Sequence, residues 1–150
     1  HLMCKEPIKY IEKLVNYNVS NITFHEEVDE DLFDIIDLIK KYNIGVGMSI
    51  KPNTSIDKLD KYLDKINLVL VMSVEPGYGG QEFMLSSLDK VRKLKKKIKD
   101  RNLDVKIEID GGVKDTNINL IKESGVDISV VGSFVTKSDD FNNSINILKY

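Results

Sequence analysis

The sequence predicts an α/β fold with a parallel sheet, and three observations lead to that prediction. Short runs of β-branched residues recur along the chain, and an amphipathic helical pattern follows each of them. Two of the runs, 68–72 and 128–131, are almost continuously apolar, which is typical of strands covered on both faces. The alternation of strand and helix is uninterrupted and leaves two architectures open, an open doubly wound sheet and a closed (β/α) barrel.

The elements are predicted in chain order from these patterns. The strands are expected at 22–24, 46–50, 68–72, 105–109 and 128–131. The helices, with apolar residues spaced three and four apart, are expected at 31–42, 56–63, 88–98, 116–123 and 141–150. Ser55 and Asp115 are predicted to cap the helices that follow them, and Gly45 and Gly125 lie where helices should end. All 150 residues fit one domain.

The composition excludes several classes of protein. Hydrophobic residues make up 41% of the chain, enough for a buried core. The net charge of -2 and the absence of tryptophan disfavour a nucleic-acid partner. No apolar run approaches the ~20 residues that cross a membrane, and no signal peptide is expected. The lone cysteine, Cys4, can form no internal disulfide and fits a cytoplasmic location.

Each of the last three predicted strands leads into a glycine-bearing loop. These loops are Gly77-Tyr78-Gly79-Gly80, Asp110-Gly111-Gly112 and Gly132-Ser133. Glycine lets the backbone turn tightly and bring its N–H groups close to an anion. In (β/α) barrels the carboxyl ends of the strands form the active face, and phosphate often binds at the loops after the last two strands. Tight turns alone would also use glycine, but three successive loops favour a barrel with a phosphate site.

Two strand-end side chains are candidates for chemistry. Asp110 follows a strand and precedes two glycines, a position suited to proton transfer at carbon or to metal ligation, with a helix cap or surface charge as the alternative. His25 ends another strand and is either a ligand or a packed histidine. Neither GxGxxG nor GxxxxGK[ST] is present, which disfavours dinucleotide and P-loop sites.

Several segments, in a fixed order, resemble the ribulose-phosphate 3-epimerase family. The most specific is VLVMSVEPGYGGQEFM, from Val69 to Met84. The others are 1–3, 23–26, 49–54, 110–113 and 131–133, so the resemblance spans essentially the whole chain. It implies a (β/α)8 TIM barrel that interconverts D-ribulose 5-phosphate and D-xylulose 5-phosphate. This isomerase of the pentose phosphate pathway moves the C3 proton through an enediolate.

The same resemblance assigns roles to residues of this chain. His1 and Asp110 fall on ligands of a divalent metal, which is zinc, iron, manganese or cobalt in different members. Asp110 also falls on a catalytic proton donor, whereas His25 matches a family histidine that is not counted as a ligand. Met3 and Met72 fall on methionines that line the cavity beside the reacting carbons. The implied substrate-binding positions are His1, Gly77, Tyr78, Gly79, Gly80, Asp110, Gly111, Gly112, Gly132 and Ser133.

The resemblance also shows a departure from the family pattern. The family begins with two more strands, which carry a serine, a metal-binding histidine and the aspartate that accepts a proton. Because His1 would stand on the family's third strand, we expect one partial-barrel domain over residues 1–150, with about six parallel strands, strands 3 to 8 of the family. With one acid and two ligands absent, we expect the chain alone to lack epimerase activity.

Three functions stay open at this point. The chain is part of an active epimerase, a non-catalytic partial barrel that binds phosphate, or an epimerase of a related ketose phosphate such as allulose 6-phosphate. The run EPGYGGQ at 75–81 favours the pentose enzyme. A small sugar phosphate is the expected partner in each case, with neither nucleic acid nor membrane, and a homo-oligomer is an expectation by resemblance.

Overall fold

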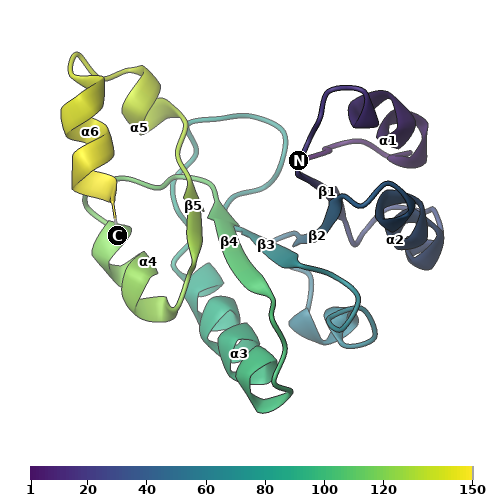
Figure 1. Cartoon of the computed structure of the whole chain (residues 1–150). Helices are drawn as coiled ribbons and strands as arrows, with labels where there is room; N and C mark the ends of the chain where they lie inside the picture. Colours follow the sequence, from purple (N-terminus) through teal and green to yellow (C-terminus); the bar gives the residue numbers. More distant parts are fainter. Residues whose placement is uncertain (150) are drawn as a thin grey trace.

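A computed structural model describes residues 1–149 and contains one five-stranded parallel sheet (Figure 1). The strands are β1 (Asn21–His25), β2 (Gly45–Ile50), β3 (Leu68–Met72), β4 (Lys106–Asp110) and β5 (Ile128–Val130). They lie in the sheet in the same order as in the chain, and every neighbouring pair is parallel. A doubly wound sheet reverses its strand order at a switch point, whereas a barrel wall does not. The strand order therefore favours a barrel wall over a doubly wound sheet.

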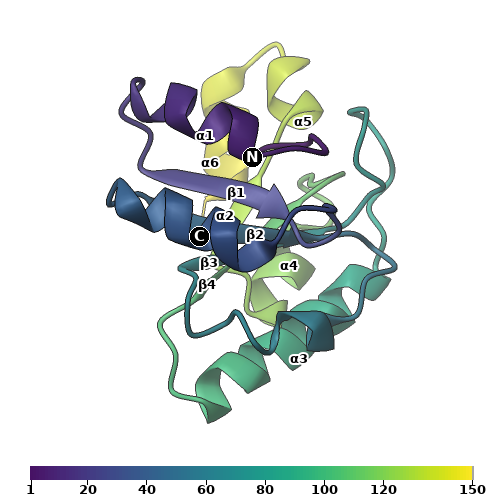
Figure 2. The ribbon, with the colours of Figure 1, turned by 90° about the vertical axis from the view of Figure 1, so that its right-hand side faces the viewer.

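The helices surround one side of this curved sheet, as Figures 1 and 2 show. They are α1 (Ile8–Val15), α2 (Leu32–Lys41), the 3-10 helix η1 (Ile56–Leu59), α3 (Ser86–Asp100), α4 (Ile118–Ser124), α5 (Ser133–Thr136) and α6 (Phe141–Leu148). The strands are parallel, and in Figure 2 the long loop between β3 and α3 lies beyond the carboxyl end of β1.

Alternation along the strands gives the sheet two different faces. The outer face packs against the helices and forms the main core, with Ile22, Phe24, Val46, Met48, Ile50, Val69, Val71, Ile107 and Ile109 all buried. The predicted helical stripes meet it, and α3 buries Leu88, Val91, Leu94 and Ile98. Full burial of one such side chain stabilises the fold by about 1.5–3 kcal/mol. This face gives the site a rigid wall.

The segment predicted as a helix at 56–63 is instead the short 3-10 helix η1 followed by turns, so that prediction is wrong. Tight i to i+3 hydrogen bonds, from Asp60 N to the Asp57 carbonyl and from Tyr62 N to the Leu59 carbonyl, replace the α-helical pattern. Its apolar side chains still reach the core, since Leu59, Tyr62 and Leu63 are buried.

Two of the four predicted helix ends are confirmed. Ser55 caps η1 by accepting from Asp57 N, and Gly125 ends α4 in the left-handed region at φ 99°. Asp115 does not cap α4, because the side chain of Asn117 accepts from Lys114 N and closes a turn, and the helix begins only at Ile118. Gly45 opens β2, whereas Asn43 makes the left-handed turn after α2 at φ 56°.

The sixth predicted strand, at residues 1–3, is a single parallel β-bridge between Leu2 and Phe24. Helices α1 and α5 were not predicted, since α1 buries only Ile11 and α5 has four residues. Tyr150, the end of the last predicted helix, lies outside the described residues. Among residues 1–149, no helix is long and apolar enough to cross a membrane.

Candidate active site

The inner face of the sheet carries the polar groups of the candidate site. Met72 lies opposite Asp110 in the register of β3 and β4, and Leu70 lies opposite Glu108. Leu68, Leu70 and Met72 form a small apolar cluster of their own on this face. Asp110 therefore stands at the carboxyl end of β4 and Glu108 in the middle of that strand, both beside the apolar side chains of β3.

A cavity of about 460 Å³ opens at these strand ends, within the size range of small-molecule sites. It gathers every site residue predicted from the sequence except His1. These residues are Met3, Met72, Gly77, Tyr78, Gly79, Gly80, Asp110, Gly111, Gly112, Gly132 and Ser133. All three glycine-bearing loops therefore meet at one cavity, although they lie far apart in the sequence.

Two of these glycines are required by the backbone. Gly111 has φ 123°, and a Cβ there would lie 2.5 Å from Cγ2 of Val74. Gly112 has φ 62°, and its Cβ would lie 2.6 Å from the backbone nitrogen of Phe83. By contrast, a Cβ on Gly79 would meet nothing within 4 Å. The loop after β4 therefore passes so close to the loop after β3 that only glycine fits.

Polar side chains that the sequence reading gave no role hold these loops together. Ser73 is fully buried, and its Oγ lies 2.8 Å from the Asp110 carbonyl and 2.7 Å from the Gly111 carbonyl. The Gln81 amide donates to the carbonyls of Glu75 and Tyr78, at 2.7 and 2.9 Å. These contacts give the cavity wall a defined shape. Their only sequence signal was membership in the VLVMSVEPGYGGQEFM run.

His1 lies beside Asp110 at the edge of the cavity. Its Nδ1 is 4.0 Å from Oδ2 of Asp110, and the two side chains are 18% and 26% exposed. Burial raises the pKa of Asp110 above its ordinary value. Burial, together with the charge of Asp110, also raises the pKa of Glu108. A raised pKa brings a carboxyl closer to the protonated form that a general acid uses.

His25 is buried between His1 and Glu27. The Nε2 atoms of His1 and His25 are 2.9 Å apart, and the rings stack with centroids 4.9 Å apart. On its other side, His25 Nδ1 lies 3.1 Å from Oε2 of Glu27. The structure thus favours the packed reading of His25 over the reading as a ligand.

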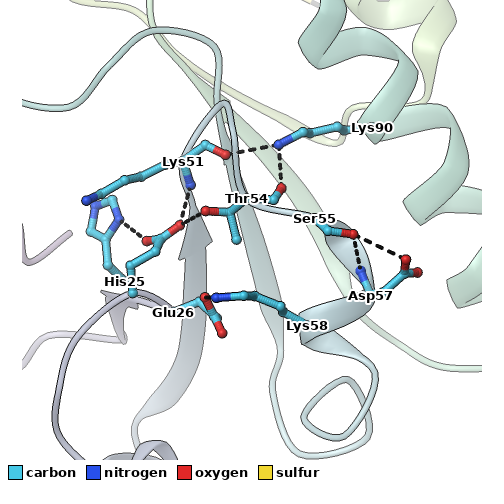
Figure 3. A network of polar contacts seen from close by, with 9 residues as sticks. His25, Glu26, Lys51, Thr54, Ser55, Asp57, Lys58 and Lys90 are labelled. Atoms are coloured by element: carbon cyan, nitrogen blue, oxygen red, sulfur yellow. Dashed lines mark hydrogen bonds and ion pairs between the residues drawn. The ribbon is translucent and has the colours of Figure 1, made fainter.

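Glu27 anchors this network to the loop after β2, which carries Lys51 and Thr54 in Figure 3. Its Oε1 accepts from the Lys51 backbone N–H at 2.8 Å and from the Thr54 hydroxyl. Burial opposes ionisation of Glu27, but hydrogen bonds from His25, Lys51 and Thr54 outweigh it and lower its pKa to about 2. Lys90 holds the same loop by donating to the carbonyls of Lys51 and Thr54. The sequence reading missed this network, because Glu27 follows strand β1 without any motif of its own.

His1 and Asp110 are of the residue types that bind divalent cations. Two ligand atoms bonded at ~2.0–2.2 Å to one cation lie ~3.3–3.6 Å apart in a tetrahedral site, so the 4.0 Å separation between His1 and Asp110 must shorten by about 0.4–0.7 Å to hold such a cation. No group of three or more His, Cys, Asp or Glu side chains in residues 1–149 could hold a metal. The described residues therefore offer two candidate donors, His1 and Asp110.

Parallel strands in barrel order, with a cavity of glycine-bearing loops at their carboxyl ends, define a (β/α)-barrel protein with a candidate site at the strand ends. Solved structures agree on the fold: a 3-hexulose-6-phosphate synthase has a TM-score of 0.71 at 14% identity, covering 97% of this chain and 68% of that one. A tryptophan synthase α-subunit variant from Pyrococcus furiosus has a TM-score of 0.70 at 18% identity, covering 93% and 59%. The fold is a partial TIM barrel.

The chain belongs to the ribulose-phosphate 3-epimerase family, whose sequence profile matches residues 1–136. It is 39% identical over 141 residues to the ribulose-phosphate 3-epimerase of Serratia marcescens, covering 94% of this chain and 67% of that protein. With the Escherichia coli K12 enzyme the identity is 36% over 149 residues, covering 99% and 66%. The chain thus spans about two thirds of the length of these relatives. The family resemblance predicted from the sequence is confirmed.

Proposed function

We propose that this chain supplies the phosphate-binding loops and one proton-transfer acid of a ribulose-phosphate 3-epimerase, which interconverts D-ribulose 5-phosphate and D-xylulose 5-phosphate. The observation that carries the proposal is the meeting of all three glycine-bearing loops and Asp110 at one cavity of about 460 Å³. Relatives named for this activity, at 36–39% identity, support it.

In this proposal the loops bind the substrate through its phosphate. Gly77 to Gly80, Gly111, Gly112, Gly132 and Ser133 offer short side chains and close backbone approach, which suits an anion held by N–H groups. The phosphate lies away from the reacting carbon, so binding there orients the sugar without taking part in the bond changes.

Asp110 is the proposed proton carrier at C3, since it stands at the strand end within the same cavity. Met72, 1% exposed, walls the cavity beside it and limits access of water to the reacting carbon. Inversion at C3 needs a proton acceptor on one face and a donor on the other, and Asp110 supplies one of the two. His1 and Asp110 would hold a divalent cation, of zinc, iron, manganese or cobalt as the resemblance implies. When bound, such a cation would stabilise negative charge on the substrate oxygens.

Two experiments on the purified 150-residue chain test the proposal. Calorimetric titration with D-ribulose 5-phosphate should give binding that is lost when ribulose without the phosphate replaces it. A turnover assay with added zinc or manganese should give no epimerisation at an enzymatic rate, because one acid and two ligands of the family pattern are absent. Normal turnover by this chain would refute the second expectation, and absence of phosphate-dependent binding would refute the first.

The completeness of the loop cavity favours one alternative, a partial barrel that binds phosphate without catalysis. A protein that joins this chain to the two strands of the family pattern separates the cases: turnover there supports the epimerase. Comparing D-ribulose 5-phosphate with D-allulose 6-phosphate as substrates tests the related ketose phosphate. We further propose a cytoplasmic setting, which the lone cysteine fits, and leave a homo-oligomer as an expectation from the family.

A further inference from the structure

A line of contacts runs from Glu27 through His25 and His1 to Asp110. Glu27 Oε2 lies 3.1 Å from His25 Nδ1, and the two histidines meet through Nε2 atoms 2.9 Å apart. Nδ1 of His1 then faces Asp110 at 4.0 Å. All four groups can ionise, and the two histidines can also change tautomer, so the protonation of Glu27 is linked through the ring protons to the His1 nitrogen that faces Asp110.

The hydrogen bonds of Glu27 indicate which ring nitrogen of His25 carries a proton. A carboxylate only accepts, and Oε1 of Glu27 already accepts from Lys51 N and the Thr54 hydroxyl. Oε2 is left for His25. Because Glu27 is ionised at neutral pH, the Nδ1 atom of His25 must carry the proton that this contact needs.

The tautomer of His1 follows from that of His25. If the His25 ring carries only the Nδ1 proton, its Nε2 has a lone pair, and His1 then donates its own Nε2–H across the 2.9 Å contact. The lone pair of His1 is then on Nδ1, the atom that faces Asp110. A direct N–H donation from Nδ1 to Asp110 would place the atoms at ~2.7–3.2 Å, and the observed 4.0 Å is too long for it. The Nδ1 lone pair of His1 and the Asp110 carboxylate are therefore two candidate donors to one cation, at a separation that must shorten when the cation binds.

We propose that Glu27, acting through His25, is a positioning residue that holds His1 in the Nε2–H tautomer and so presents its Nδ1 to a divalent cation shared with Asp110. The inference rests on the proposed function in taking a divalent cation as the ligand. Lys90 supports Glu27 indirectly, because its ammonium donates to the carbonyls of Lys51 and Thr54 and holds the loop that carries both donors to Oε1.

The first test needs no substitution. In the metal-free 150-residue chain with 15N-labelled histidine, long-range 1H–15N NMR at neutral pH reports which ring nitrogen carries the proton. We expect His1 to be protonated at Nε2 and His25 at Nδ1. Protonation of His1 at Nδ1 alone, or of both nitrogens of either ring, would overturn the inference.

The second test replaces Glu27. In Glu27→Gln the amide oxygen keeps the Lys51 and Thr54 donors, so the NH2 group turns toward His25 and should reverse both tautomers. Zinc affinity, followed through the His1 ring 15N shift, should fall about 10-fold or more, the usual effect of losing a group that orients a ligand. The matched control is Glu26→Gln, which removes a carboxylate one residue away that pairs with Lys58 outside this line. Circular dichroism checks that both variants are folded.

Unchanged tautomers and zinc affinity in folded Glu27→Gln, or equal losses in both variants, would refute the positioning role. If Glu27→Gln does not fold, the tautomers of His1 and His25 in the unsubstituted chain still test the inference. Failure of this inference can be told apart from failure of the proposed function. If the NMR experiment finds the opposite tautomers in the unsubstituted chain, phosphate binding and the proposed epimerase activity are unaffected. Expected tautomers without turnover in the completed protein would count against the function alone.

Discussion

Acidification should destabilise this chain through Glu27 in a defined pH window. The folded-state pKa of Glu27, about 2, lies below its ordinary value of 4.5. A carboxyl with a lowered folded pKa stabilises the fold above its unfolded pKa, and this contribution is lost as the pH falls through 4.5 towards 2. One pKa unit is worth about 1.4 kcal/mol, so the largest contribution is about 3 kcal/mol. Because 16% of the side chain remains exposed, solvent screening lowers our expectation to about 2 kcal/mol.

The assay is the free energy of unfolding in guanidinium chloride, measured from pH 7 to pH 2.5 for the unsubstituted chain, Glu27→Gln and Glu26→Gln. Other carboxyls titrate in the same window, but they cancel in the difference between the chain and its variant. That difference should be about 2 kcal/mol at pH 7 and shrink steadily below pH 4.5 for Glu27→Gln. A difference independent of pH, or the same pH dependence in the Glu26→Gln control, would refute the reasoning.

Two further predictions concern the cavity. In a protein with the complete family barrel, Asp110→Asn should lower kcat at least ~100-fold, because it removes a proposed proton carrier. The affinity for the sugar phosphate, measured by calorimetry, should stay within a few-fold. Lost binding with retained turnover would contradict the assigned role. Gly112→Ala forces a Cβ to 2.6 Å from the Phe83 nitrogen at φ 62°, so it should cost about 1–3 kcal/mol in guanidinium unfolding and weaken phosphate binding. Its control is Gly79→Ala, where the Cβ meets nothing within 4 Å and stability should change by less than about 0.5 kcal/mol.

The sequence predicts what local periodicity encodes. The strand patterns place all five strands to within a residue or two. Burial is predicted less well, because the run at 128–131 is expected to be covered on both faces, whereas Ile128 and Val130 of β5 are exposed. The same periodicity fails at 56–63, where Leu59, Tyr62 and Leu63 are buried as expected but tight i to i+3 hydrogen bonds hold them. Apolar spacing reports which side chains are buried, and it does not distinguish an α-helix from a 3-10 turn followed by loops.

The residues of the candidate site also fall into those that the sequence could predict and those that it could not. The glycine loops and Asp110 could be found because they follow strands in the chain, and strand ends of a parallel sheet meet at one edge. Glu27, Thr54 and Lys90 could not, because their partners are 24 to 39 residues away and depend on how the loop after β2 folds over β1. A carboxylate two residues after a strand-end histidine is the one local signal that could have suggested Glu27.

The two tasks of the cavity depend on different kinds of structure and should therefore fail separately. In the proposed function, phosphate binding depends on backbone that only glycine permits, at Gly111 and Gly112, and on the loops after β3 and β5. Proton transfer in the same proposal depends on Asp110 at the end of β4 and on His1 beside it, with Glu27 as the proposed positioning residue. Substitutions in the loops should then raise KM with little change in kcat, whereas substitutions along the line from Glu27 to Asp110 should lower kcat and cation affinity with little change in phosphate binding.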